Sequence, residues 1–240
     1  MSNIIGIIPA RRGSQSIKKK NIRDFHGKPL ISWTIECALE SDLDRVIVST
    51  DDQEIRDIAL SCGAEVPFLR PTEFADSHSG IEPVLKHAYE YFTNVEHYQV
   101  DVLVMLLPTS PFRHVEDINN ALEIYEKNEV TSVVSVVKAE ANINPHWMLV
   151  EGQNGVELLN GEALTDIKDR RQDLPDVYIR NDFVYVLNPN NLFEAKPNLY
   201  GDKVQLLKIS EHRYDIDINT EKDWSVAEAI FGFTENLERF

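Results

Sequence analysis

The distribution of apolar and polar positions along the chain predicts an α/β protein. Short β-branched and apolar runs alternate with stretches of helical periodicity through the first 137 residues, which is typical of a mostly parallel sheet with helices on both faces. The predicted strands are residues 4–8, 45–50, 65–69, 101–107 and 131–137. The predicted helices are residues 29–39, 53–62, 115–125 and one that begins near residue 80.

A less regular region interrupts this alternation. Residues 138–175 contain Asn, Pro, Gly and charged residues and no long helical pattern, so we interpret them as an arm inserted into a single domain of residues 1–240. Core patterning resumes with predicted strands at residues 182–187, 203–209 and 214–219 and a short helix at residues 189–193. Thr220 is a suitable N-cap for a last helix, which we expect to run through residue 230.

Composition and charge narrow the class of ligand. The 240 residues suit one large domain, and a formal net charge of -16 argues against nucleic acid polymers and anionic membranes as partners. The two cysteines, Cys37 and Cys62, suggest neither a disulfide framework nor a metal site. The sequence shows no targeting pattern and no apolar run of about 18 residues, so we expect a cytoplasmic protein.

A basic cluster follows the first predicted strand. Pro9 ends that strand, and five of the chain's 24 cations then fall within ten positions: Arg11, Arg12, Lys18, Lys19 and Lys20. Small residues among them let backbone N–H groups approach an anion that the cations neutralise, so the loop predicts a phosphate site. The alternative is a solvated basic loop.

Polar residues end two more predicted strands, and acids alternate along a third. Ser49, Thr50 and Asp51 end the strand at 45–50, and residues 108–113 place hydroxyls and the Arg113 guanidinium after the strand at 101–107. Carboxyl ends of parallel strands form the edge at which open α/β sheets bind ligands. In the strand at 214–219, a period of two puts Asp215, Asp217 and Asn219 on one face, where their oxygens suit Mg²⁺. An equally good interpretation is a half-exposed strand whose acids face water. The basic loop favours the first interpretation, because a phosphate site and a carboxylate pair together would form a magnesium–nucleotide site.

Seven motifs occur in order over nearly the whole chain. They are IPARRGSQSIKKKN, VIVSTDD, RPTEFAD, LLPTSPFR, RRQDLP, the N-x-x-x-Y-V stretch from Asn181, and DIDINTEKDW. Together they resemble the acylneuraminate cytidylyltransferase family, which comprises CMP-sialic acid synthetases and their relatives for other nonulosonic acids and KDO. The resemblance implies a mononucleotide-binding, Rossmann-like fold whose arm packs on a second subunit of a homodimer.

The resemblance also implies a role for individual residues. The implied catalytic residues are Arg11, Lys20 and Asp217. The implied nucleotide contacts are Pro9, Ala10, Arg11, Gly13, Ser14, Lys20, Asn21, Arg70 and Ser79. The implied sugar contacts are Leu107, Thr109, Ser110, Arg171, Gln172 and Asn181, and the implied Mg²⁺ ligands are Asp215 and Asp217.

The implied reaction joins CTP to a 2-keto-3-deoxy sugar acid and gives the CMP-sugar and pyrophosphate. The anomeric hydroxyl would attack the α-phosphorus in line, while Mg²⁺ and the basic loop take up the accumulating charge. Which nonulosonic acid is used stays open, because the sequence does not identify the side chains that read its substituents.

Three positions depart from the family pattern. Gln15 replaces a lysine, Leu107 replaces a glutamine, and Asn219 replaces the second acid of an Asp-x-Asp pair, so the metal pair has either shifted to Asp215 and Asp217 or lost one charge. Two alternatives to a CMP-nonulosonate synthetase therefore stay open. One is a nucleotidyltransferase of this fold with another base or acceptor, and the other is a nucleotide-binding homologue without turnover.

Overall fold

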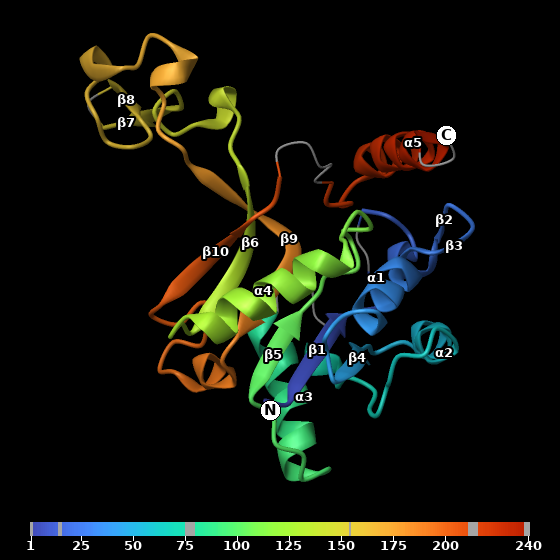
Figure 1. The fold of residues 1–240 in the computed structure, drawn as a ribbon. Coiled ribbons are helices and arrows are strands. Elements are labelled where there is room, and N and C mark those ends of the chain that lie inside the picture. Colours follow the sequence, from blue (N-terminus) through green and yellow to red (C-terminus); the bar gives the residue numbers. More distant parts are fainter. Residues whose placement is uncertain (1, 14–15, 75–79, 154, 211–215, 238–240) are drawn as a thin grey trace. The chain divides into compact units, whose positions relative to one another are not determined.

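The main sheet has six strands in the order β10-β6-β9-β5-β1-β4 (Figure 1). The computed structural model describes residues 2–13, 16–74, 80–153, 155–210 and 216–237. The strands are β1 (Ile4–Pro9), β4 (Arg45–Ser49), β5 (Val102–Met105), β6 (Ser132–Lys138), β9 (Tyr178–Leu187) and β10 (Val204–Lys208). Strand β1 pairs in parallel with both β4 and β5, whereas β5 pairs antiparallel with β9.

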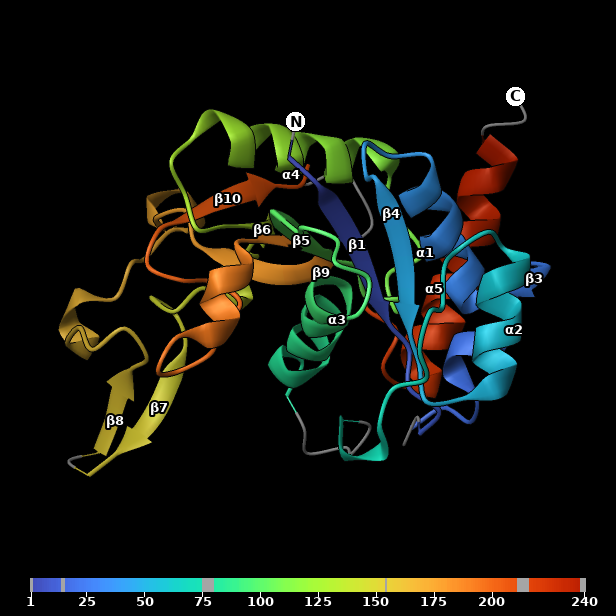
Figure 2. The same cartoon turned by 90° about the horizontal axis from the view of Figure 1, so that it is seen from below.

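Helices cover both faces of this sheet, so the predicted α/β class is confirmed. They are α1 (Leu30–Leu39), α2 (Gln53–Ser61), α3 (Glu82–Asn94), α4 (Val115–Lys127) and α5 (Glu221–Leu237). Figures 1 and 2 show α4 on one face and α3 on the other. Strands β1 and β5 are apolar on both sides because they are covered on both sides; Ile5, Ile7, Ile8, Leu103 and Val104 have no exposed surface.

Local signals in the sequence explain where the elements end. The Asp52 carboxylate caps α2 by accepting from the amides of Glu54 and Ile55. Gly63, which follows that helix, has a φ of 95°, a conformation that costs other residues energy. Short 3₁₀ turns connect the remaining elements: η1 (Lys20–Ile22), η2 (Thr72–Phe74) and η6 (Pro189–Phe193), beside a small hairpin of β2 (Asp24–Phe25) and β3 (Lys28–Pro29).

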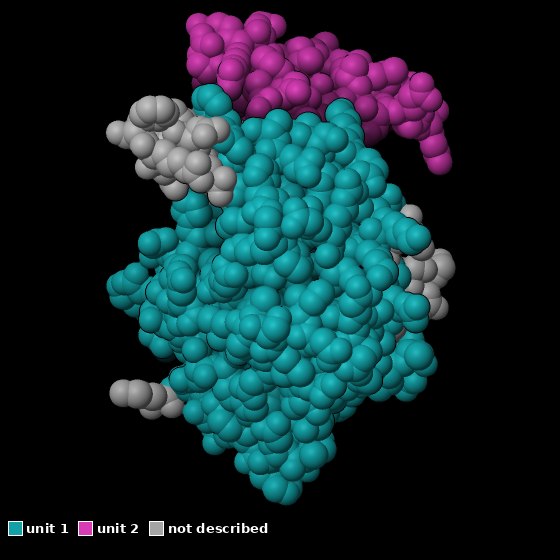
Figure 3. Space-filling model, turned by 90° about the vertical axis from the view of Figure 1, so that its right-hand side faces the viewer, with its two compact units in different colours: residues 1–135, 181–207, 214–240 teal, residues 136–180, 208–213 magenta. Residues whose placement is uncertain are grey.

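The chain forms two compact units (Figure 3). Unit 1 comprises residues 1–135, 181–207 and 214–240, and unit 2 comprises residues 136–180 and 208–213. Unit 2 holds the hairpin of β7 (Leu149–Gly152) and β8 (Gly155–Leu158) and the turns η3 (Ala141–Ile143), η4 (Leu164–Asp166) and η5 (Arg171–Asp173). Side-chain hydrogen bonds stabilise unit 2 internally. Asn144 Nδ2 donates to the Pro175 carbonyl over 3.0 Å, and Trp147 Nε1 donates to the Lys168 carbonyl over 2.6 Å.

Two predicted strands are wrong. Residues 65–69 contribute only one parallel bridge, between Glu65 and Ile47. Residues 216–219 have no regular structure, because the Ile218 amide bonds to the Thr109 carbonyl and the Asn219 amide to the Asp223 carboxylate instead of to a neighbouring strand. The argument that alternate acids share a strand face therefore fails for Asp217 and Asn219, and Asp215 lies outside the described residues.

Other boundaries move by a few residues. Helix α5 runs to Leu237 rather than to residue 230, and β9 begins at Tyr178 rather than at residue 182. Across the residues that the structure describes, no helix combines the length and the apolar character needed to span a membrane.

Candidate active site

The loop after β1 is fastened to the carboxyl end of β4. The Ala10 amide donates to the Ser49 carbonyl over 2.9 Å, and the Arg12 amide donates to Asp51 Oδ1 over 2.8 Å. Buried Asn21 closes the loop by donating from Nδ2 to the Arg11 carbonyl over 3.1 Å. Parallel pairing of β1 with β4 thus brings the basic cluster next to the polar end of the second strand.

Several predicted nucleotide contacts lie in this loop. Ala10 is buried and Pro9 half-buried, while Gly13 is exposed. A Cβ placed on Gly13 would meet no atom within 4 Å, so the chain leaves space there. Ser14 and Ser79 lie outside the described residues, as does Gln15.

Lys20 joins this loop to the C-terminal segment. Its Nζ donates to the Ile218 carbonyl over 2.6 Å and to Asn219 Oδ1 over 3.3 Å. Burial of the ammonium lowers the pKa of Lys20 below its ordinary 10.5, while the nearby Asp217 raises it and Arg11 lowers it. Two residues that are 197 positions apart in sequence, Lys20 and Asp217, therefore belong to one electrostatic cluster.

Asp217 is the carboxylate of this cluster. Its Oδ2 accepts from the Asn219 amide group, and its Oδ1 is buried without a hydrogen-bond partner among the described residues. A buried carboxylate oxygen in this state is costly unless a cation or donor occupies the space beside it. Asp217 is thus suited to bind a metal ion through one oxygen, although the described part of the chain contains no group of three or more acids, His or Cys that could hold one.

Asn219 connects Lys20 and Asp217, a role that the sequence does not reveal. Its side-chain oxygen accepts from Lys20, and its side-chain nitrogen donates to Asp217. An aspartate in this position would lack the second of these hydrogen bonds. The segment reaches the site because the Ile218 amide donates to the Thr109 carbonyl over 2.9 Å and because Arg23 pairs with Glu221 at 2.8 Å.

Arg70 lies at the same end of β4. Its guanidinium is 5% exposed and donates to the Ser49 hydroxyl over 3.2 Å, to the Ser49 carbonyl and to the Phe74 carbonyl. Burial lowers the pKa of Arg70 to about 10, with Asp51 raising it and Arg11 lowering it. At neutral pH this side chain is a buried cation that adds positive charge next to the basic loop, while its described hydrogen bonds go to the chain itself.

The predicted sugar contacts in unit 1 include three polar atoms that have no partner. Ser110 Oγ, Asn181 Oδ1 and Asn181 Nδ2 are buried and form no hydrogen bond among the described residues. Leu107 and Thr109 are half-exposed on the same turn after β5. Buried polar groups normally have partners, so these atoms are suited to receive a polar ligand.

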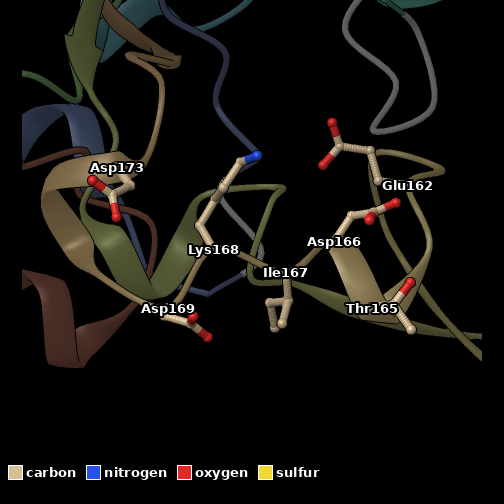
Figure 4. A pocket seen from close by; sticks show the side chains of 7 residues that line it. All are labelled: Glu162, Thr165, Asp166, Ile167, Lys168, Asp169 and Asp173. Carbon is tan, nitrogen blue, oxygen red and sulfur yellow. The ribbon is translucent and has the colours of Figure 1, made fainter.

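Arg171 and Gln172 belong to η5 of unit 2, where both are exposed. Unit 2 also contains a cavity of about 530 Å³, shown in Figure 4 and lined by Glu162, Thr165, Asp166, Ile167, Lys168, Asp169 and Asp173. Its lining carries four carboxylates and one ammonium, and this excess of negative charge repels an anionic nucleotide or sugar acid. We therefore do not include this cavity in the candidate site.

Arg113 is not available to a ligand at the edge of the sheet, although the sequence had suggested that it would be. Its guanidinium is 5% exposed and bonds to backbone carbonyls and to Thr34, so it is a structural side chain rather than an open ligand contact. The sequence could not show this because all but one of its acceptors are backbone atoms.

The fold and these features define a class: an α/β protein in which basic, amide and carboxylate side chains gather where β1, β4 and β5 end. The model of the cytidylyltransferase family matches residues 5–229. The chain therefore belongs to the cytidylyltransferase family, and the sequence-based prediction is confirmed.

Individual relatives are consistent with this. The chain is 33% identical over 228 residues to the CMP-N,N'-diacetyllegionaminic acid synthase of Legionella pneumophila, an alignment that covers 95% of both chains. It is 35% identical over 173 residues to the pseudaminic acid cytidylyltransferase of Campylobacter jejuni, covering 72% of each. A solved structure of CMP:2-keto-3-deoxy-manno-octonic acid synthetase with CTP has a TM-score of 0.72 at 15% identity, covering 97% of this chain and 100% of the other, which shows a shared fold.

Proposed function

We propose that this protein transfers the CMP group of CTP to a nonulosonic acid and releases pyrophosphate. The observation that carries this proposal is the cluster in which Lys20, Asn219 and Asp217 meet beside the loop after β1. A cation and a carboxylate with a free oxygen are the two groups needed to hold a triphosphate and its metal ion. Relatives that the chain matches over most of its length are named as cytidylyltransferases for such sugar acids.

In the proposed reaction the anomeric hydroxyl of the sugar acid attacks the α-phosphorus of CTP. A new oxygen–phosphorus bond forms, the bond to the bridging oxygen breaks, pyrophosphate leaves and the hydroxyl proton passes to solvent. Arg11 and Lys20 offset the charge on the phosphates, and Asn21 keeps their loop in place through the Arg11 carbonyl. Pro9, Ala10, Gly13, Ser14, Arg70 and Ser79 would complete the nucleotide site.

Asp217 would hold Mg²⁺, with Asp215 as the proposed second protein ligand. The unpartnered Oδ1 of Asp217 supports the first of these assignments. When bound, the ion would neutralise part of the triphosphate charge.

The sugar acid would bind along Leu107, Thr109, Ser110 and Asn181. We propose Arg171 and Gln172 as further sugar contacts, as the family resemblance implies. The unpartnered hydroxyl of Ser110 and the unpartnered amide of Asn181 support a ligand rich in hydroxyl and amide groups.

We also propose a homodimer that forms through unit 2. Nine large apolar side chains of this unit are between 37% and 57% exposed: Ile143, Met148, Leu149, Val150, Val156, Leu159, Leu164, Ile167 and Ile179. Such a concentration is typical of a surface that a partner covers. We place the enzyme in the cytoplasm, where CTP is available and where two free cysteines, Cys37 and Cys62, stay reduced.

The test is pyrophosphate release with Mg²⁺, each of the four nucleoside triphosphates, and a panel of sialic, legionaminic and pseudaminic acids and KDO. We expect release with CTP only, lost by at least about a hundredfold in Asp217→Asn and retained in the control Asp202→Asn, whose carboxylate is exposed. Release with a different nucleotide would point instead to another nucleotidyltransferase. No pyrophosphate release with any nucleotide or sugar acid, while CTP still raises the melting temperature, would favour a binding protein without turnover.

A further inference from the structure

The buried guanidinium of Arg113 has an unusual set of partners. It donates from Nη2 to the Leu107 carbonyl over 2.7 Å and to the Asp182 carbonyl over 3.0 Å, and from Nε to the Phe183 carbonyl. Its Nη1 donates to the Thr34 hydroxyl on α1 over 3.0 Å. Three of its four acceptors are therefore backbone carbonyls of two segments, the end of β5 and the middle of β9.

The register of the sheet explains why a cation is needed there. Strands β5 and β9 pair in antiparallel fashion, with Val104 opposite Val186 and Met105 opposite Tyr185. Continuing that register by two residues would place Leu107 opposite Phe183. Both residues lie beyond the last pair of the ladder, Met105 and Tyr185, and the carbonyls of both accept from Arg113. The guanidinium supplies the donors that join the strands beyond the last ladder pair.

Two residues with unpartnered polar atoms flank this junction. Ser110 follows Leu107 by three residues and Asn181 precedes Phe183 by two, and each has buried side-chain atoms without a partner among the described residues. The junction thus fixes the backbone on both sides of the atoms that the proposed function assigns to the sugar acid.

We propose that Arg113 is a positioning residue for the sugar acid, because it sets the separation between the Leu107–Ser110 turn and the Asn181–Phe183 part of β9. This inference rests on the proposed function for the nature of the ligand. The link that Arg113 makes between the two backbone segments, called the clamp below, concerns this chain alone. Lysine cannot replace arginine here: an ammonium on one carbon stem cannot reach carbonyls on two strands and the Thr34 hydroxyl together.

The experiment compares Arg113→Lys with the matched control Arg45→Lys. Arg45 is also a largely buried arginine with several bonds, but its partners are Glu65 and Glu96, outside the candidate site. We expect Arg113→Lys to raise KM for the sugar acid by about tenfold and to lower kcat, with KM for CTP changed by less than about twofold. Arg45→Lys should lower the melting temperature and leave all three constants unchanged.

Hydrogen exchange provides a readout that does not need turnover. Arg113→Lys should increase amide exchange in residues 106–110 and 181–184, whereas Arg45→Lys should not. Unchanged exchange in both segments would overturn the clamp, whether or not the protein is active. Faster exchange with unchanged constants for the sugar acid would overturn the positioning role and leave Arg113 purely structural. If the wild-type protein releases no pyrophosphate, the proposed function is refuted. Hydrogen exchange in residues 106–110 and 181–184 would still test the clamp.

Discussion

The ammonium of Lys20 donates to the carbonyl of Ile218 over 2.6 Å, so the first loop of the chain and its last segment meet in one site. This contact orients the lysine toward Asp217 and Asn219 and explains its partial burial.

CTP affinity should depend on the protonation of Lys20. Burial lowers its pKa below 10.5 in the free protein, and a bound triphosphate would raise it again, because an anion favours the charged form. CTP binding should therefore weaken as pH rises through the lowered pKa, with about one proton taken up per CTP in that range. Calorimetry in buffers of different ionisation enthalpy measures this uptake.

The same group contributes to stability in the opposite direction. A lowered lysine pKa means that the unfolded chain binds more protons between the folded pKa and 10.5, so this contribution to stability increases as pH rises through that window. Lys20→Met should remove both effects, whereas Lys28→Met, which removes the ion pair between Lys28 on β3 and Glu36 on α1, should remove neither. Proton uptake that persists in Lys20→Met would show that another group titrates.

Asn219→Asp should strengthen metal binding. The change adds a carboxylate beside Asp217 and removes the amide that now donates to its Oδ2. We expect the Mg²⁺ concentration for half-maximal rate to fall by about tenfold, because two acids attract the ion more strongly than one. Titration of the rate with Mg²⁺ measures this, and Asn219→Ser serves as the control that removes the amide without adding charge. A requirement for more Mg²⁺ in Asn219→Asp would show that the bridge to Lys20 matters more than the added charge.

Leu107→Gln should alter the choice of sugar acid. Leu107 is half-exposed on the turn next to Ser110, so an amide there gains access to hydroxyl groups of the ligand. We expect kcat/KM for the more hydroxylated acids to rise relative to kcat/KM for the deoxy acids, chiefly through a lower KM. The shift in this ratio should correspond to about 1–3 kcal/mol. KM for CTP should stay the same. Identical preferences in both proteins would remove Leu107 from the sugar site.

Charges on the unit 2 hairpin should prevent dimerisation. Leu149 is 57% exposed on β7 and Val156 is 49% exposed on β8, so an aspartate at each position is tolerated by the fold but not by a buried interface. The double variant Leu149→Asp, Val156→Asp should elute as a monomer in light-scattering chromatography. Leu60→Asp on α2, where leucine is 44% exposed, should leave the oligomeric state unchanged. A wild-type monomer would contradict the proposal directly.

Patterns along the chain were enough to predict the class of fold and the order of most elements. Short apolar, β-branched runs such as residues 45–49 and 102–105 indicate buried strands, and Thr220 marks the start of the last helix by its local chemistry. Short-range patterns are sufficient there because each element buries its own apolar residues. The seven motifs were likewise enough to identify the family, because they occur in order along nearly the whole chain.

The way in which the distant parts of the site meet could not be predicted from patterns along the chain. Residues 216–219 alternate like a strand, yet their amides bond to Thr109 and Asp223, so Asp217 reaches Lys20 from an irregular segment. Arg113 looked like a ligand contact and is instead a buried link between β5 and β9. In each case a deciding partner is a backbone carbonyl far away along the chain, that of Thr109 for Ile218 and those of Asp182 and Phe183 for Arg113. The side-chain pattern of a sequence does not show where such carbonyls lie.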